Sequence, residues 1–178
     1  MNTIFYTDKS HFPSSKEFIE IILEKHFQIP NYEILKSESG KPYFSNYEVI
    51  DHGNPLYFSI THTKEKYFIA FSRQNVGIDS ELQYRKPDYE AIIAKFDEKE
   101  RNEITSTTDF LKHWTVKESA IKWLGGTISK DLNKLSFVNG KLLFKGLDLP
   151  ISLAQFELEN HFISVCHEKT SEWKFITV

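Results

Sequence analysis

The sequence predicts an α+β fold of two similar small lobes, each a helix followed by antiparallel strands. The prediction rests on two helical patterns, separated by short aromatic and β-branched segments, and on a length that suits this arrangement. The chain has 178 residues, of which 40% are hydrophobic and 15% aromatic, enough to form a core shared by two lobes. We place the boundary near Asn75, so that residues 1–75 form an N-terminal lobe and residues 76–178 form a C-terminal lobe.

The composition excludes several classes of protein. There are 25 acidic and 22 basic residues, so the net charge of -3 gives no overall positive field for nucleic acid or an anionic membrane. Cys166 is the one cysteine and has apolar neighbours, which favours a buried thiol and a reducing compartment. The chain has neither a signal-peptide pattern at its start nor an apolar run of about 18 residues. We therefore expect a cytoplasmic monomer without nucleic-acid or membrane partners.

In the N-terminal lobe we expect one helix and then an antiparallel meander. Ser14 and Ser15 precede a helical apolar pattern over residues 16–28, and Pro30 prevents its continuation. The segment SGKP at 39–42 is the clearest turn signal that follows. Short aromatic and β-branched runs come next and are typical of antiparallel strands. The expected strands are 57–63, 66–72 and 75–82.

In the C-terminal lobe we expect helices, a hairpin and two further strands. The helical pattern between Asp109 and Leu124 stops at Gly125-Gly126, as helices commonly do. The dipeptide Asn139-Gly140 divides the apolar run LSFVNGKLLF and is a strong hairpin signal. The other expected elements are helices at 88–96 and 97–104 and strands at 151–159 and 161–168.

Asp79 and Glu81 are the first candidate metal ligands. Strand alternation over residues 75–82 puts both carboxylates on one face and apolar residues on the other. Two adjacent carboxylates repel each other unless a cation lies between them, which is how metal sites with oxygen ligands are built. A solvated outer face of an edge strand is the alternative, because such pairs are common on protein surfaces.

Glu118 is the third candidate, because it interrupts an apolar stripe. At about 100° per residue it falls within the arc that includes Leu111 and Ile121 on the expected helix at 109–124. Burying an unpaired charge costs several kcal/mol, so Glu118 should have a cationic partner, for which Lys122 is one candidate. The alternative is an exposed Glu–Lys pair four residues apart, worth about 0.3 kcal/mol and requiring no function.

Four short strings occur in a fixed order along the chain and carry a family resemblance. They are GKP at 40–42, SITHT at 59–63, VGIDSE at 76–81 and WTVKESAIKWLGG at 114–126. Together they resemble the signature of the Sfp-type 4′-phosphopantetheinyl transferases. No single string is specific, but four in the same order over the middle half of the chain are hard to reach by chance. The resemblance implies that family's fold, a pseudo-dimer of two α+β lobes.

The resemblance also implies an activity. This activity is the transfer of 4′-phosphopantetheine from coenzyme A to a serine of an apo acyl or peptidyl carrier protein, releasing adenosine 3′,5′-bisphosphate. On the matching positions, Asp79, Glu81 and Glu118 would be ligands of Mg²⁺, which would bridge the diphosphate.

Further catalytic roles follow from the matching positions. Lys122, one turn beyond Glu118, would stabilise the charge that grows on the diphosphate, and Lys117 could assist from the neighbouring position. A carboxylate or a metal-bound water must accept the proton of the serine. By family position the carboxylate is Glu100, although an exposed residue in the charged run FDEKER is the alternative.

The strings GKP and SITHT would contact the phosphates or ribose of coenzyme A. Strand alternation places His62 on the same face as the apolar residues two and four positions before it, so a buried core histidine is the alternative. Either hydroxyl on the other face could then reach a phosphate. The residues expected to bind coenzyme A are Lys41, Pro42, Ser59, Thr61, His62 and Lys117.

The N-terminal lobe departs from the family pattern. Family members carry a basic stretch before GKP, whereas the first forty residues here have no arginine, and their lysines are Lys9, Lys16, Lys25 and Lys36. We therefore expect a shortened lobe, and one alternative function is a non-catalytic module that binds coenzyme A or a carrier protein. Another is an unrelated two-carboxylate nuclease or phosphatase, which would leave GKP and SITHT unexplained.

Overall fold

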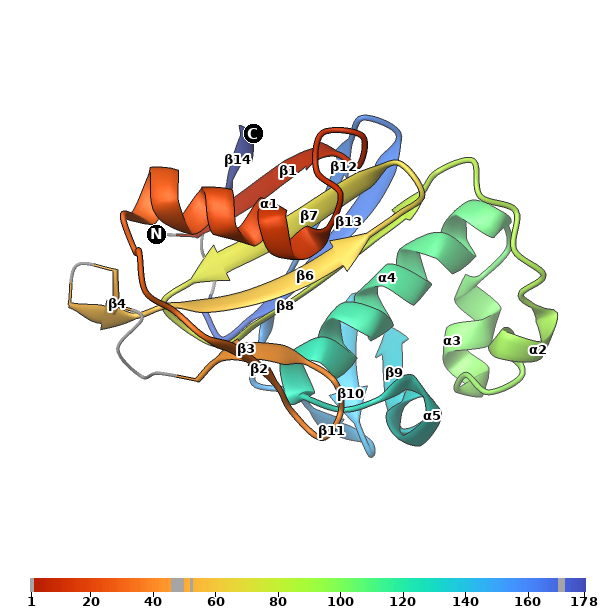
Figure 1. Cartoon of the computed structure of the whole chain (residues 1–178). Helices are drawn as coiled ribbons and strands as arrows, with labels where there is room; N and C mark the ends of the chain where they lie inside the picture. Colours follow the sequence, from red (N-terminus) through yellow and green to blue (C-terminus); the bar gives the residue numbers. More distant parts are fainter. Residues whose placement is uncertain (1, 46–49, 52, 170–171) are drawn as a thin grey trace.

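Two sheets, each with a helix on its outer face, form the core of the chain (Figure 1). The computed structural model describes residues 2–45, 50–51, 53–169 and 172–178. Strands and helices are mixed along the chain, so the expected α+β class is confirmed. None of the described helices is long and apolar enough to cross a lipid bilayer.

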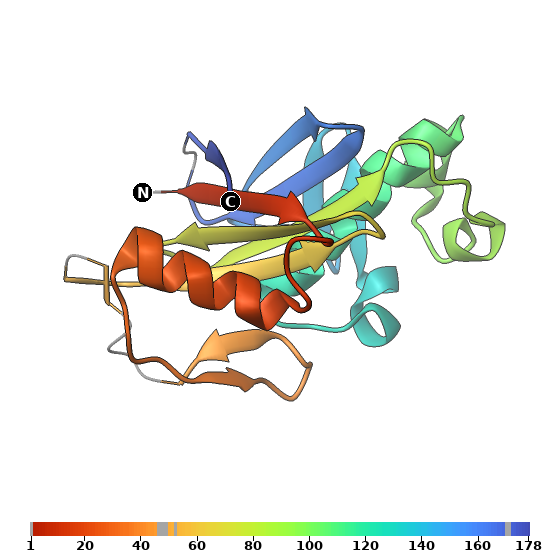
Figure 2. The same ribbon diagram turned by 45° about the horizontal axis from the view of Figure 1, so that its top comes forward.

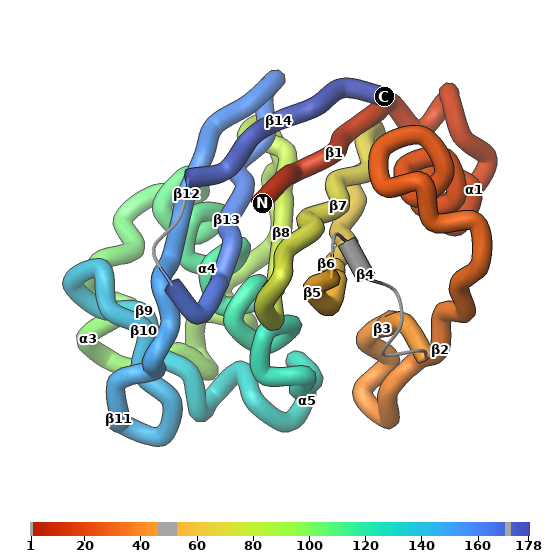
Figure 3. Tube along the Cα trace, turned by 90° about the vertical axis from the view of Figure 1, so that its left-hand side faces the viewer, coloured from red at the N-terminus to blue at the C-terminus, as the bar shows by residue number. Residues whose placement is uncertain are grey.

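The first sheet has the strand order β14-β1-β7-β6, and only the pair β1 and β14 is parallel. Figure 3 shows β14, from the end of the chain, lying beside β1 from its beginning. Because the last strand belongs to the sheet of the first half, the two halves of the sequence are interwoven. The strands are β1 (Thr3–Asp8), β6 (Tyr57–His62), β7 (Lys66–Ser72) and β14 (Lys174–Thr177).

The second sheet has the order β12-β13-β8 and is antiparallel throughout. The expected strand at 75–82 forms, but it does not continue the meander, because it pairs with β13 instead of β7. This pairing moves the two candidate carboxylates of β8 into the sheet of the second half. The strands are β8 (Val76–Leu82), β12 (Ser152–Leu158) and β13 (His161–His167).

Helix α1 (Ser15–Ile22) covers the first sheet, and helix α4 (Thr107–Leu124) covers the second. Helix α1 begins where the hydroxyl of Ser14 accepts the N–H of Glu17, and it continues as the π-helical turn η1 (Leu23–Phe27). Helix α4 ends at Gly125, whose φ of 67° is favoured by glycine. Between the sheets, apolar residues of β1 and β7 meet those of β8 and β13.

The remaining elements are short. The hairpin of β2 and β3 lies below α1 and beside the first sheet in Figure 2. The hairpin at Asn139-Gly140 is confirmed, with positive φ at both residues. The elements are β2 (Ile34–Lys36), β3 (Pro42–Phe44), β4 (Ile50–Asp51), β5 (Asn54–Pro55), α2 (Glu90–Ile93), α3 (Glu98–Glu103), α5 (Ile128–Asp131), η2 (Leu132–Lys134), β9 (Leu135–Val138), β10 (Lys141–Phe144) and β11 (Leu147–Asp148).

The main sequence-based expectations hold, with local differences. Helices and strands form close to their expected bounds, except that the helix expected at 88–96 is helical only over Glu90–Ile93. The strands β1, β2, β3 and β14 were not expected from their residues. The division of the chain at Asn75 and the equivalence of two lobes stay predictions.

Two histidines at the ends of β13 connect the second sheet to the first. The Nε2 atom of His161 lies 3.0 Å from the hydroxyl of Thr63, and that of His167 lies 2.7 Å from the hydroxyl of Ser72. The Nδ1 atom of His161 lies 2.8 Å from the carbonyl oxygen of Glu159. Since the carbonyl can only accept, Nδ1 carries the proton and Nε2 accepts from Thr63.

Helix α4 and strand β8 lie backbone against backbone at Gly77. A Cβ atom at this position would overlap the carbonyl oxygen of Ser119 and lie 2.5 Å from the backbone nitrogen of Trp123. The absence of a side chain therefore sets the distance between the helix and the strand. Both carry candidate metal ligands, so this distance also sets the spacing of those ligands.

We predict that Gly77→Ala destabilises the chain by about 3 kcal/mol, because the new methyl group must push two backbone segments apart. Urea unfolding followed by tryptophan fluorescence would measure the change. Gly140→Ala is the matched control, since it has open space but a φ of 74°, and should cost about 1 kcal/mol. Equal losses in the two variants would contradict the close approach of α4 to β8.

We also predict that His161 makes the chain less stable as the pH falls from 7 to 5. Burial lowers the pKa of His161 below its usual 6.5, although the Glu159 carbonyl and the charge of Glu65 oppose this shift. The unfolded chain then binds the proton more readily, so stability is full above pH 6.5 and falls as the pH approaches the folded pKa. Unfolding at several pH values should show a smaller loss in His161→Gln. An unchanged pH dependence in that variant would refute the prediction.

Candidate active site

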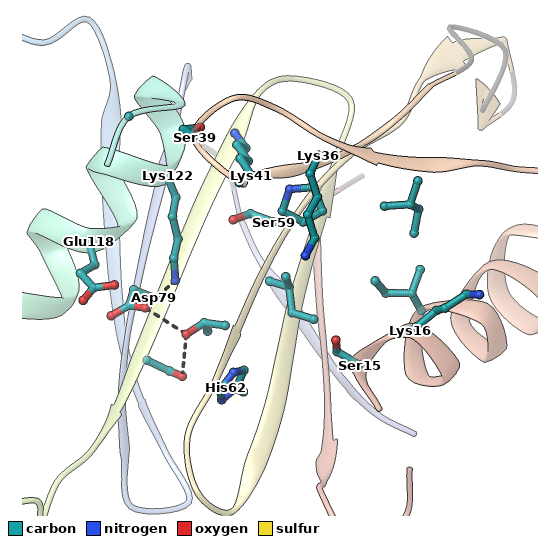
Figure 4. A pocket seen from close by; sticks show the side chains of 18 of the residues that line it. Ser15, Lys16, Lys36, Ser39, Lys41, Ser59, His62, Asp79, Glu118 and Lys122 are labelled. Carbon is teal, nitrogen blue, oxygen red and sulfur yellow. Dashed lines mark hydrogen bonds and ion pairs between the residues drawn. The ribbon is translucent and has the colours of Figure 1, made fainter. Parts of the chain in front are cut away.

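A cavity of about 1240 Å³ lies between α1, the β2–β3 hairpin, β6, β8 and α4 (Figure 4). The chain brings nine of the eleven expected site residues to it, from four separate elements and the turn before β3. They are Lys41, Pro42, Ser59, Thr61, His62, Asp79, Glu81, Glu118 and Lys122. The structure does not bring Glu100 or Lys117 to this cavity.

Asp79 is buried and forms the centre of the polar contacts in the cavity. Its Oδ1 atom accepts a 2.6 Å hydrogen bond from Nζ of Lys122 and a 2.9 Å bond from the hydroxyl of Thr61. Nζ of Lys122 also donates to the carbonyl oxygen of Ile78 at 3.0 Å. These bonds hold α4, β8 and β6 together at one point. The alternative of a solvated outer face is therefore wrong for Asp79, which is 5% exposed.

Glu118 points toward Asp79 from α4 (Figure 4). The pKa of Glu118 is raised to about 8, first by burial and then by the charges of Asp79 and Glu81, while Lys122 opposes the shift. Gathering these carboxylates in a half-buried position therefore costs free energy. At this end of the cavity the ammonium group of Lys122 is paired with Asp79.

Glu81 lies next to Asp79 along the cavity wall and forms an ion pair with Arg85. Burial raises the pKa of Glu81, and the guanidinium of Arg85 opposes this shift. Glu81 thus has its own positive partner, four residues further along the chain.

The chemistry of these side chains fits a divalent metal ion. Across the described residues, no three His, Cys, Asp or Glu side chains come close enough to hold a metal ion as they stand. However, carboxylate oxygens are preferred ligands of Mg²⁺, and a cation would relieve the repulsion that raises the pKa of Glu118. Asp79, Glu81 and Glu118 are the residues that could hold the ion, and this role stays a prediction.

Lys41 reaches into the protein between the hairpin and β8. Its Nζ atom donates to Oδ1 of Asn75 at 2.9 Å and to the carbonyl oxygen of Val76 at 3.1 Å. The Asn75 side chain in turn donates to the carbonyl oxygen of Trp123 at 2.7 Å, near the end of α4. Burial lowers the pKa of Lys41 to about 8. Asn75 thus joins the hairpin to the helix, a role that no sequence signal predicted.

The hydroxyls of SITHT point into the protein, while the histidine faces outward. Ser59 accepts the N–H of Ile78 at 3.2 Å, and Thr61 donates to Asp79. Both are therefore bonded within the protein although they also line the cavity. His62 is exposed, with Nδ1 at 3.5 Å from Nζ of Lys9, so the alternative of a buried core histidine is wrong.

Glu100 and Lys117 form a buried ion pair outside the cavity. Both side chains are 0% exposed, and Nζ of Lys117 lies 2.7 Å from Oε2 of Glu100. The alternative of Glu100 as an exposed residue in a charged run is therefore wrong. Neither side chain lines the cavity. Their expected roles in proton transfer and coenzyme A binding stay predictions that this arrangement does not support.

Several cavity residues were missed by sequence reasoning because they come from the first forty residues. The signal that could have found those on α1 is helical spacing, since positions 15, 16, 19 and 20 share one face of a helix.

Tyr32 also lines this side of the cavity. Burial raises the pKa of Tyr32 to about 12, together with the charge of Glu20 and a hydrogen bond to it. The additional lining residues are Ser15, Lys16, Ile19, Glu20, Tyr32, Glu33, Ile34, Lys36, Ser39, Gly40, Ile60, Ser80 and Gly126.

We predict that Asn75→Asp raises the pKa of Lys41 from about 8 by one unit or more, because a carboxylate next to Nζ favours the charged amine. Lysine side-chain NMR over pH 6–11, with Lys41→Arg to identify the signal, would measure it. Asn75→Ala is the control, since it removes the acceptor without adding charge. A Lys41 pKa that is the same in both variants would contradict the contact.

Comparisons with known proteins agree with this geometry. The sequence model of the 4′-phosphopantetheinyl transferase superfamily matches residues 75–175, more than half of the chain. The chain is also 32% identical over 120 residues to the 4′-phosphopantetheinyl transferase gsp of Aneurinibacillus migulanus, covering 60% of this chain and 46% of that protein. The chain thus spans about half the length of this curated relative. The resemblance seen in the sequence is confirmed, and the chain belongs to the 4′-phosphopantetheinyl transferase superfamily.

Proposed function

We propose that this chain transfers 4′-phosphopantetheine from coenzyme A to a serine of an apo acyl or peptidyl carrier protein, with Mg²⁺. The observation that carries the proposal is the meeting of Asp79, Glu81, Glu118 and Lys122 in one large cavity. A cation site beside a lysine suits a diphosphate, which needs both a metal ion and hydrogen-bond donors. Membership of the superfamily supports the reaction, and the gsp protein is a relative with that name.

The cavity suits a long anionic ligand because its walls carry charges of both signs. The candidate metal ligands lie on β8 and α4, whereas Lys16, Lys36 and Lys41 line the side formed by α1 and the hairpin, together with Glu20 and Glu33. A volume of about 1240 Å³ exceeds that of ordinary small-molecule sites, which hold about 300–1,000 Å³. Coenzyme A, with a diphosphate in its middle and a 3′-phosphate at one end, matches this distribution of charge.

In the proposed reaction, the serine oxygen of the carrier attacks the phosphorus that bears pantetheine. The bond from this phosphorus to the bridging oxygen of the diphosphate breaks, and adenosine 3′,5′-bisphosphate leaves with the electron pair. The serine proton goes to a base. Because Glu100 is buried outside the cavity, the base must be a cavity carboxylate or solvent.

Lys122 and Lys41 would act on the phosphates. Nζ of Lys122 has three protons and gives two to Asp79 and Ile78, so one remains to donate to the diphosphate. Lys41 likewise gives two protons to Asn75 and Val76. Their bonds within the protein fix both ammonium groups before the substrate arrives, which reduces the cost of ordering them. When bound, Mg²⁺ would neutralise charge on the diphosphate.

We predict that the chain modifies at least one apo carrier protein when it is mixed with coenzyme A and Mg²⁺. Mass spectrometry of acyl and peptidyl carriers should show the gain of one phosphopantetheinyl group, and EDTA should abolish it. Lys122→Met should lower kcat/KM by about 100-fold or more, because it removes a preorganised donor from the leaving diphosphate. A transferase of known activity serves as the positive control.

Three outcomes would overturn the proposal. If the positive control modifies every carrier and this chain modifies none, the chain is not an active transferase. Binding of coenzyme A in calorimetry without any turnover would identify the non-catalytic module. Hydrolysis of simple phosphodiesters would identify a phosphatase or nuclease. The cytoplasmic location, the monomeric state and the lack of nucleic-acid partners remain part of the proposal.

A further inference from the structure

A fully buried ion pair joins α3 to α4, and in Figure 1 α3 lies across α4 from strand β8. Nζ of Lys117 lies 2.7 Å from Oε2 of Glu100 and 2.5 Å from the carbonyl oxygen of Leu135. It also lies 4.0 Å from the centre of the Phe96 ring. The ammonium group therefore has partners from α3, from β9 and from the segment before α3.

The same carboxylate contacts α4 a second time, one turn earlier. Oε1 of Glu100 lies 3.4 Å from Nδ1 of His113, and His113 and Lys117 are four residues apart on one side of the helix. Glu103, on the next turn of α3, lies 3.8 Å from Nε2 of His113 and accepts the N–H of Asn139 at 2.9 Å. Acidic side chains of α3 thus contact α4 at two successive turns, at His113 and at Lys117.

These contacts bear on the cavity because Lys117 is the direct neighbour of Glu118. Successive side chains on a helix point about 100° apart, so fixing the direction of Lys117 also fixes that of Glu118. Apolar packing is non-directional and tolerates small rotations of a helix, whereas hydrogen bonds and ion pairs depend on direction. Lys122, one turn beyond, is oriented by the same rotation.

We propose that Glu100 and Lys117 form a positioning pair, which fixes the rotation of α4 so that Glu118 and Lys122 face Asp79. The effect on phosphopantetheine transfer rests on the proposed function. The pair itself does not touch substrate, and Glu100 acts through α4 instead of accepting the serine proton.

The cost of burying charge supports a role beyond stability. Two fully buried opposite charges lose their hydration free energy, and their mutual attraction offsets little more than this loss. A protein with apolar residues of similar volume in their place is often as stable. Stability alone would therefore be served by an apolar pair. A directional requirement explains why the chain has charged groups here.

The test uses the double variant Lys117→Met/Glu100→Leu, which removes both charges and keeps an apolar contact. We expect a melting temperature within about 3 °C of the unchanged chain, because no unpaired charge remains. We also expect kcat/KM to fall by about tenfold or more, because Glu118 is no longer held in position. In lysine side-chain NMR, the Lys122 ammonium signal, identified with Lys122→Met, should shift or broaden as its bond to Asp79 loosens.

The single variant Glu100→Gln keeps the shape of the side chain and gives a second measure if the double variant does not fold. It leaves Lys117 charged and buried, so the melting temperature should fall by about 10 °C, and the Lys122 signal should change. The matched control is Lys112→Met/Glu157→Leu, because Lys112 lies on the same helix and its ion pair of 2.8 Å with Glu157 of β12 is exposed. This control should leave the melting temperature and the Lys122 signal unchanged.

Two results would overturn the proposal. A stable double variant with unchanged activity and an unchanged Lys122 signal would show that the pair is only structural. Loss of activity in Glu100→Gln, with an unchanged melting temperature and Lys122 signal, would show that Glu100 acts in the chemistry itself. If the unchanged chain shows no transfer, the proposed function fails, and the NMR signal of Lys122 still tests the positioning.

Discussion

The close approach of α4 to β8 at Gly77 is the constraint on which the rest of the site depends. A strand separates Asp79 and Glu81 by two residues, and a helix separates Glu118 and Lys122 by four. The side chains of the strand reach those of the helix because the two backbones lie against each other at Gly77. A Cβ atom at this position would overlap the carbonyl oxygen of Ser119. At this distance Lys122 reaches both a carbonyl oxygen and a carboxylate of the strand. The glycine of VGIDSE thus sets the geometry of the site that the acids line.

This approach has an electrostatic consequence. It brings carboxylates together where water is partly excluded, and burial, together with the neighbouring negative charges, raises the pKa values of Glu118 and Glu81. Lys122 and Arg85 offset part of the negative charge, each through one carboxylate. Without a cation, the raised pKa of Glu118 favours its neutral form near pH 7, and a bound cation would favour its charged form. A protein keeps such an arrangement when the binding of a ligand repays its cost.

The sequence predicted those parts of the fold and the site that depend on local pattern. The long helix, the Asn139-Gly140 hairpin and the acids of β8 and α4 all follow from spacing within one element. The strands β1 and β14 were not predicted, because they pair with each other from the two ends of the chain, and no short stretch of sequence contains both. The charged neighbours of Glu100 left an exposed residue as the alternative to its expected role, whereas its burial depends on Lys117, 17 residues away. Such residues are set by tertiary partners, which local patterns do not record.

The small number of basic residues among the first forty is a second case in which a local pattern does not record tertiary partners. Counting charges in one stretch suggests a weak grip on a nucleotide, yet Lys16, Lys36 and Lys41 line one cavity from a helix, a strand and a turn. A phosphate responds to the local potential where charges meet, and this potential falls off within about 8 Å at physiological salt. In the proposed function, the three lysines that folding brings to one cavity would serve where a contiguous basic run is missing. Whether this lobe binds phosphate therefore depends on where its lysines lie in the folded chain, and not on how many occur in one stretch of sequence.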